Sequence, residues 1–321
     1  MSRTRYLLGR LAFIVVAAYA LLSVTFFFVA FTPDPNEAFV AYAAAMSGSD
    51  TEAAIAGYRA ARNRDVALLT RYIGWLVSYT TLDWGQARAA GEGSVLGLIR
   101  FVSPNTLAYV LPGLAFAAIA GVVTGVWNAV RPRSLAARLA AGGAIVLGAV
   151  PSYWLGYLLA MQSIQRLELL RFYKYEPSTT FAATNLPNLF LASVTIAAAL
   201  TVVQVRYVRS GTAEFVRTEA AKLVRMKGGR DRDVVRHALR LLGASVFTLF
   251  LTESLTVLFL GIYVVETVFR IPGFGELSLR AIDARDVPLI LGTTFVPVVI
   301  GLLGTFVQDL VEMALDPRVG E

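Results

Sequence analysis

Six long runs of uncharged, mostly apolar residues divide this chain, and each is long enough to cross a membrane. A helix needs roughly 20 residues to cross about 30 Å of hydrocarbon. Five runs contain no charged residue, and the remaining one is interrupted only by Glu253. The runs are Leu11–Pro33, Phe101–Val130, Leu139–Gln165, Pro177–Val205, Leu241–Val265 and Val287–Gln308. The pattern predicts an all-α membrane protein, a single domain over residues 1–321, with six transmembrane helices.

The composition agrees with this pattern. Apolar residues make up 56% of the chain and charged residues only 16%, whereas about a quarter of an ordinary soluble domain is charged. A water-soluble fold of this composition would expose large apolar patches. The composition therefore predicts a multi-pass protein of the cell membrane, with membrane lipid around its apolar helices.

The positive charges are concentrated in particular loops. Arginines precede the first run, three more lie in loop 131–138, and segment 206–240 holds ten Lys and Arg residues against four acids. Segment 32–103, by contrast, has six against seven. Lys and Arg favour the cytoplasmic side, so both termini and segment 206–240 are expected there. The net charge of +7 then reflects topology, and no nucleic-acid partner is expected.

The only sizeable segment outside the runs is 32–103, which we expect to form an external helical insertion. Apolar residues recur at helical spacing between Leu68 and Val77, which is typical of an amphipathic helix. This helix is expected at the outer membrane interface or against the transmembrane helices. Trp75 and Trp84 suit an interfacial position.

The sequence offers little that would support catalysis. It has no GxxxxGK[ST] loop, no HExxH motif and no GxSxG motif, and it contains one His and no Cys. Glu253 and Glu266 would lie about 20 Å apart along one helix, too far to act as a catalytic pair. We therefore expect no enzyme activity, no catalytic or metal-binding residues and no cofactor.

Segment 206–240 contains a helix-prone, highly charged stretch. Thr212 is expected to cap a helix that has Glu214 in its first turn and ends at Gly228. One interpretation is a polybasic loop that meets anionic lipid and fixes the topology. The other is a helix whose apolar face docks into a groove on a cytoplasmic protein.

Several motifs resemble one family in order along the chain. "EFVRTEAAKLVRMKGGRDRDVVRHALR" resembles the EAA loop of ABC-importer permeases, most closely the dipeptide/oligopeptide/nickel branch. Supporting matches are "SPNTLAYVLPG" at 103–113, "VPSYWLGYLLA" at 150–160, "VVETVFRIPGFG" at 264–275 and "ALDPRV" at 314–319. Four residues more than the family pattern lie between Thr218 and Lys227, which would lengthen the docking helix by about one turn.

The resemblance implies a permease subunit of an ATP-driven importer, with a cytoplasmic EAA-like coupling helix between the fourth and fifth spans. Implied partners are a second, homologous permease in a heterodimer, two cytoplasmic ATPase subunits that hydrolyse the ATP, and an external substrate-binding protein. Di- or oligopeptides are the implied substrate. The implied ATPase-docking residues are Glu214, Arg217, Thr218, Glu219, Ala220, Ala221, Lys222, Leu223, Lys227 and Gly228.

The translocation path is expected to include Glu253 and Glu266. Glu253 lies near the middle of the fifth run, where an ionisable group is costly. It either faces the path or makes a protonated hydrogen bond to another helix. Glu266 either gates the path or binds a loop amide. Two alternatives to the permease subunit remain: a stand-alone secondary transporter, for which no internal repeat is found, and a membrane-anchored interaction protein.

Overall fold

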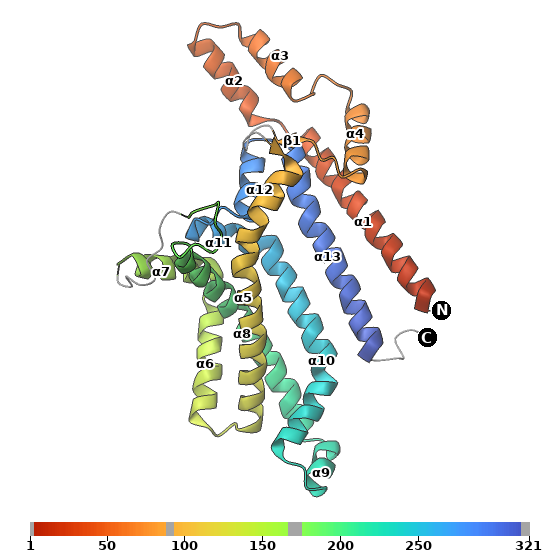
Figure 1. Cartoon of the computed structure of the whole chain (residues 1–321), viewed down its shortest axis with the longest axis vertical. Helices are drawn as coiled ribbons and strands as arrows, with labels where there is room; N and C mark the ends of the chain where they lie inside the picture. The colour runs from red at the N-terminus through yellow and green to blue at the C-terminus, as the bar shows by residue number, and fades with distance from the viewer. Residues whose placement is uncertain (1–2, 88–92, 166–174, 316–321) are drawn as a thin grey trace. The chain divides into compact units, whose positions relative to one another are not determined.

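The computed structural model describes residues 3–87, 93–165 and 175–315. This part of the chain is almost entirely helical, as the sequence predicts (Figure 1). Its contacts divide it into two compact units. In the described chain, unit 1 holds residues 103–276 and 304–315, and unit 2 holds residues 4–102 and 277–303. Most of the motif at 314–319 lies outside the described residues.

The helices of unit 2 come from the two halves of the chain. They are α1 (Arg3–Phe31), α2 (Pro35–Met46), α3 (Thr51–Ala61), α4 (Leu68–Thr80), the start of α5 (Val95–Val130), most of α12 (Phe274–Asp283) and most of α13 (Val287–Leu315). Two short antiparallel strands, β1 (Gln86–Ala87) and β2 (Gly93–Ser94), precede α5, with Gln86 paired to Ser94. This small ladder was not predicted.

Unit 1 contains the rest of the apolar helices. They are most of α5, then α6 (Leu135–Ala149), α7 (Ser152–Gln165), α8 (Leu186–Val216), α9 (Glu219–Met226), α10 (Asp231–Thr256), the π-helical segment η2 (Val257–Gly261) and α11 (Ile262–Phe269). Five stretches of the described chain are long and apolar enough to span a membrane: Arg5–Met46, Val95–Val130, Leu186–Val216, Asp231–Phe269 and Val287–Val311.

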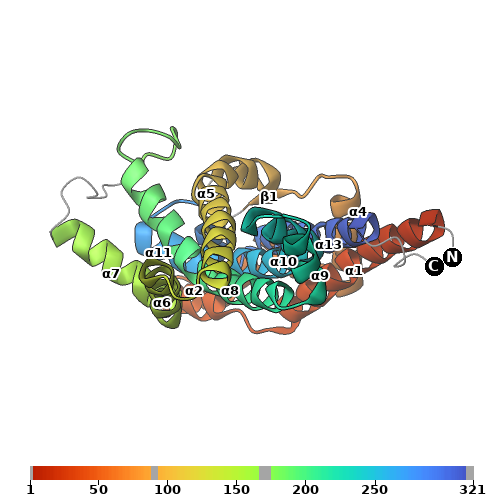
Figure 2. The ribbon, with the colours of Figure 1, turned by 90° about the horizontal axis from the view of Figure 1, so that it is seen from below.

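The predicted third span is not one straight helix. It consists of α6 and α7, bent by 100° at their junction, and α7 turns away from α6 in both views (Figures 1 and 2). Pro151 supplies no N–H for an α-helix and disfavours helical geometry at the residue before it. Val150 accordingly has an extended conformation, with ψ of 127°. Counted as one broken span, the pair brings the total to six.

The fourth span begins later and ends later than predicted. Pro177 is not in the helix, because residues 175–185 form an irregular segment fixed by the side chain of Asn185. Its Nδ2 donates to the carbonyl oxygens of Glu176 and Thr179, each at 2.9 Å, and its Oδ1 accepts from the Glu176 amide. The helix then continues past Val205 to Val216.

Small residues let α5 and α8 approach closely within unit 1. A Cβ on Gly125 would lie 2.8 Å from Cβ of Val208, and one on Gly113 would lie 2.9 Å from the carbonyl oxygen of Ser193. Neither glycine can therefore carry a side chain without moving its neighbour. The backbones of α5 and α8 therefore lie close together at these two positions.

The amphipathic helix predicted around 68–77 is α4. Within unit 2 its Tyr72 hydroxyl lies 2.8 Å from Ser23 Oγ of α1, and Tyr79 is buried against Phe295 of α13. The interfacial position suggested for Trp84 stays a prediction, but its side chain does not face outward. Trp84 is buried and stacks on Tyr79 with ring centroids 4.9 Å apart, because aromatic contacts between α4 and α13 enclose it.

Candidate functional site

Glu266 is fully buried in unit 1, at the end of the fifth span, and receives several hydrogen bonds. Its Oε1 accepts from the hydroxyls of Thr106 at 2.7 Å and Tyr109 at 3.0 Å. Its Oε2 accepts from the backbone amide of Glu276 at 2.9 Å. We call these groups, with Asn105 and the backbone of 272–276, the Glu266 cluster. Hydroxyl and amide donors are the partners that a buried carboxylate needs when no cation is supplied.

Two sequence motifs that lie far apart in the chain meet in the Glu266 cluster. Thr106 belongs to the "SPNTL" motif and bridges the cluster, since its hydroxyl also accepts from the Phe274 amide at 2.8 Å. Asn105 of the same motif donates to the carbonyl oxygen of Pro272 at 3.0 Å. The "PGFG" turn is thus fastened to the start of the second span.

A tyrosine outside the spans extends this network. The Tyr175 hydroxyl donates to Oδ1 of Asn105 at 3.1 Å, and the Thr180 hydroxyl donates to the same oxygen at 2.7 Å. Burial, reinforced by the charge of Glu266, raises the pKa of Tyr175 to about 12. Tyr175 therefore stays protonated, and remains a donor, at neutral pH.

Gly273 makes room for the carboxylate. A Cβ at this position would collide with the Glu266 carboxyl group and would lie 2.6 Å from Oγ1 of Thr106. The preceding turn is reached through Arg270, which has a left-handed backbone with φ of 53° and ends α11. Asn105, Thr106, Tyr109 and Gly273 were not predicted as site residues, although the "SPNTL" and "PGFG" motifs contain three of them.

Glu253 has different surroundings on the same span. It is half-buried, and none of the described side chains or amides donates a hydrogen bond to its carboxylate. Its carbonyl oxygen accepts from the amide of Val257, where the helix changes to the π-helical segment η2. Such π segments are frequent at functional sites. The structure therefore separates the two predicted path residues into one enclosed carboxylate and one open carboxylate.

The charged stretch forms a separate short helix, α9. The predicted cap is wrong: Thr212 is buried inside α8 and Glu214 lies in the last turn of that helix. Thr218 is the actual cap, and its Oγ1 accepts from the Ala221 amide at 3.3 Å. The chain turns at Arg217, so the four residues that exceed the family pattern between Thr218 and Lys227 lie within α9. Gly228 follows α9 with φ of +81°.

The two faces of α9 differ in burial. Ala221 is fully buried, whereas Leu223 is 48% exposed and Met226 is 75% exposed. Glu219 and Lys222 form an exposed ion pair at 2.7 Å. The helix contacts both α8 and α10, the two long helices between which it lies. Ala220, one of the implied docking residues, is exposed, because α9 turns Ala221 inward.

The sequence pattern of a known family matches residues 120–321. Its description is "binding-protein-dependent transport system inner membrane component". Similar curated proteins include the dipeptide transport system permease protein DppB of Bacillus subtilis, at 29% identity over 79% of this chain and 80% of that protein. A putative peptide permease protein of Brucella ovis is also 29% identical, over 98% of both chains.

Two further relatives indicate the range of transported solutes. The oligopeptide transport system permease protein OppB of Mycobacterium bovis is 28% identical over 79% of this chain and 81% of its own length. The metal-staphylopine import system permease protein CntB of Staphylococcus aureus is 25% identical over 79% and 78%. The family match covers well over half of this multi-pass membrane protein and includes α9, η2 and Glu266. The chain therefore belongs to the family of binding-protein-dependent transport system inner membrane components.

Proposed function

We propose that this chain is the permease subunit of an ATP-driven, binding-protein-dependent importer of di- or oligopeptides. The family match and the names of the relatives support the transporter class. Relatives named for peptides are 28–29% identical, and the relative named for a metal chelate is 25% identical. The peptide class is therefore the better supported substrate. ATP hydrolysis takes place on separate subunits, and a second permease completes the translocation path.

The observation that carries this proposal is the exposed outer face of α9. Leu223 and Met226 present apolar surface beside the Glu219–Lys222 ion pair, a combination suited to a groove on a partner protein. The buried Ala221 fixes the helix from the other side. A force on α9 would reach α8 and α10 directly, since α9 contacts both helices.

The proposed docking residues remain Arg217, Thr218, Glu219, Ala220, Ala221, Lys222, Leu223, Lys227 and Gly228. Of these, Thr218 and Gly228 act by starting and ending α9, whereas Ala221 holds it inward. Direct contact is assigned to Glu219, Lys222 and Leu223. Glu214 is exposed in the last turn of α8, just before α9, and remains a proposed docking residue as well.

Substitutions that reverse the charge and remove the apolar character of the outer face of α9 test whether this helix docks onto the ATP-binding subunits. We expect Glu219→Lys combined with Leu223→Asp to abolish co-purification of the ATP-binding subunits of the same transporter, and to abolish uptake. Both side chains are exposed, and a solvent-exposed ion pair contributes little to stability, so the amount of permease in the membrane should not change. Arg232→Glu is the matched control, because Arg232 is an exposed charge of the same segment in α10.

The docking assignment fails if the double variant still binds the ATP-binding subunits and transports. The orientation it requires, with both termini and α9 cytoplasmic, has a separate check. In this Cys-free chain, cysteines at Ser49 and Met226 should react from opposite sides of the membrane. Met226 is preferred to Gly228 because the positive φ of Gly228 disfavours a side chain. Labelling of both from outside intact cells would contradict the topology.

A further inference from the structure

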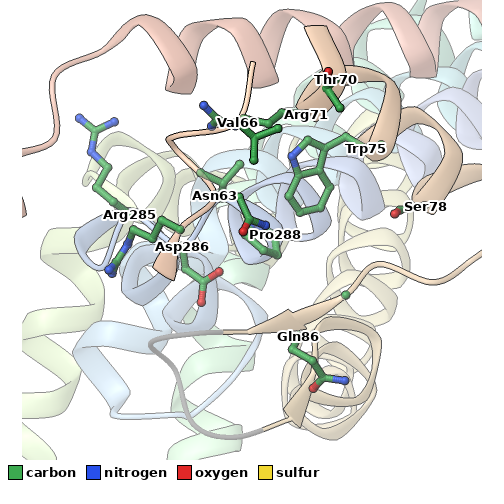
Figure 3. Close-up of a pocket in the computed structure, with 14 residues that line it drawn as sticks. Asn63, Val66, Thr70, Arg71, Trp75, Ser78, Gln86, Arg285, Asp286 and Pro288 are labelled. Carbon is green, nitrogen blue, oxygen red and sulfur yellow. The ribbon is translucent and has the colours of Figure 1, made fainter. Parts of the chain in front are cut away.

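Unit 2 contains a pocket with a mixed polar and apolar lining and a volume of about 510 Å³ (Figure 3). It is lined by the connection between α3 and α4, by α4, by β1 and by the turn that precedes α13. Trp75, Val66 and Pro288 provide apolar wall, while Asn63, Thr70 and Gln86 provide hydrogen-bonding groups. Pockets for small ligands have volumes of about 300–1,000 Å³ with a few placed polar groups, so this one has the size of a small-molecule site.

Positive charge predominates in this pocket. Arg62, Arg71 and Arg285 line it, and Asp286 is the only carboxylate among its described lining residues. Three positive charges and one negative charge leave a formal excess of two. Asp286 is 1% exposed and accepts from the Leu289 amide at 3.4 Å at the start of α13. Its charge is therefore directed at a helix N-terminus, where it is favourable.

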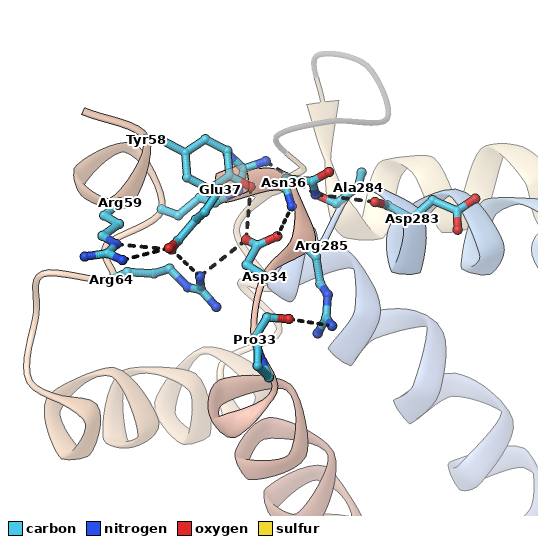
Figure 4. Close-up of polar contacts among 11 residues, drawn as sticks. Pro33, Asp34, Asn36, Glu37, Tyr58, Arg59, Arg64, Asp283, Ala284 and Arg285 are labelled. Atoms are coloured by element: carbon cyan, nitrogen blue, oxygen red, sulfur yellow. Dashed lines mark hydrogen bonds and ion pairs between the residues drawn. The ribbon is translucent and has the colours of Figure 1, made fainter. Parts of the chain in front are cut away.

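Two of the arginines are oriented by neutral groups. Arg285 donates to the carbonyl oxygen of Pro33 at 3.0 Å (Figure 4). Arg62 donates to the carbonyl oxygen of Ala284 at 3.4 Å, and its guanidinium lies 4.0 Å from the centroid of the Tyr58 ring. These contacts fix the side chains without cancelling their charge. The Nε of Arg62 is buried and has no acceptor among the described residues, an arrangement that is rare in native proteins.

Two acids at the start of α2 are paired with arginines that lie outside this pocket. Glu37 accepts from Arg59 at 2.8 Å and from Arg64 at 2.7 Å, and Asp34 lies 3.4 Å from Arg64 (Figure 4). Arg59 and Arg64 do not line the pocket. The ion pairs of Arg59 and Arg64 thus lie apart from Arg62 and Arg285, whose printed acceptors are backbone carbonyl oxygens.

We propose that this pocket binds the carboxylate of a small solute. If the function proposed above is correct, the ligand is a short peptide held by its C-terminal carboxylate. The planar guanidinium offers paired N–H donors that match a carboxylate, and Arg62 and Arg285 both line this pocket. Trp75 and Val66 then face the peptide side chains. The site is external in the orientation inferred from the Lys and Arg distribution.

The first test changes the ligand and not the protein. Purified full-length chain in lipid nanodiscs is titrated calorimetrically with dialanine and with dialanine amide, which lacks the carboxylate. We expect dialanine to bind at least about tenfold more tightly, as the loss of a charge-assisted pair would produce. Equal affinities, or no binding of dialanine, would overturn the proposal. Tighter binding of inorganic phosphate than of dialanine would also overturn it.

The second test changes the arginines. Arg62→Gln and Arg285→Gln should each weaken dialanine binding by about tenfold and leave dialanine amide unaffected. Arg59→Gln is the matched control, since Arg59 is an exposed arginine that pairs with Glu37 outside the pocket. Undiminished dialanine binding by both variants would refute the site. The α9 double variant tests a different property, so loss of ATPase docking with normal dialanine binding, or the converse, shows which proposal has failed.

Discussion

Glu266 and Glu253 lie on the same span, on opposite sides of η2, in contrasting environments. Glu266 is enclosed, with two hydroxyls and a backbone amide donating to its carboxylate. Glu253 is half-buried, and among the described residues none donates to its carboxylate. The sequence had placed both in the translocation path. The contrast indicates that a carboxylate inside a membrane span can be a structural connection or an exposed functional group, depending on its donors.

The enclosed carboxylate connects three segments of unit 1. Through Thr106 and the amide of Glu276, Glu266 joins α5, α11 and the "PGFG" turn. The bond to the Glu276 amide is the loop-amide contact considered for this residue from the sequence. Among the described residues Glu253 has no comparable set of contacts, and an ionisable group within the bilayer is often functional. We therefore retain Glu253, and not Glu266, as the proposed path residue.

The largest effect is expected for Glu266→Leu. The substitution leaves two hydroxyls and an amide in a buried site without their acceptor, and each such group costs about 1–3 kcal/mol. We expect a loss of about 3–5 kcal/mol in the free energy of unfolding, seen as a clear drop in melting temperature of the purified chain. A Glu266→Leu protein that melts like the wild type would show that the enclosure does not stabilise the fold.

A smaller effect is expected for Thr106→Val. This change keeps the shape of the side chain but removes the hydroxyl between Glu266 and the Phe274 amide, at a cost of about 1–3 kcal/mol. Thr267→Val is the matched control, because the exposed Thr267 hydroxyl bonds only locally to the Tyr263 carbonyl oxygen. Its melting temperature should hardly change. Equal shifts in melting temperature for the two variants would show that the Thr106 hydroxyl contributes no more to stability than the Thr267 hydroxyl does.

The smallest effect on stability is expected for Glu253→Gln. Because none of the described residues donates to the Glu253 carboxylate, the melting temperature should change by the equivalent of less than about 0.5 kcal/mol. Peptide uptake by the assembled transporter should nevertheless fall, because the path loses a charge. Full uptake would remove any need for a charge here. A large drop in melting temperature would instead place Glu253 with Glu266 as a structural residue.

The sequence predicted the helical membrane fold because apolar length is a local property. It did not predict the bend at Pro151 or the late start of α8. The bend has a local signal, which is the proline itself. Proline is also tolerated inside continuous spans, however, as Pro112 is in α5, so a proline alone does not predict a bend. The second depends on the contacts of Asn185 with residues 176 and 179, which no run of apolar residues reveals.

The candidate sites were predictable only in part, for a similar reason. The motifs identified Glu266 and the segment that forms α9. The partner of Glu266 lies 160 positions earlier, at Thr106, and a pairing over that distance leaves no periodic signal in one sequence. The cap of α9 was misplaced because Thr212 and Thr218 are both suitable cap residues, and only the turn at Arg217 decides between them.

Because of the π-helical segment η2, the number of residues between Glu253 and Glu266 affects the direction in which Glu266 points. A π turn accommodates one residue more than an α turn, and one residue of an α-helix corresponds to about 100° of rotation. Everything after Gly261 is therefore displaced around the helix axis relative to an uninterrupted helix. Spacing, as well as residue type, therefore determines that Glu266 points to Thr106 and Tyr109. A chain one residue shorter between Val257 and Gly261 would keep both glutamates, but it would rotate Glu266 by about 100° away from Thr106 and Tyr109.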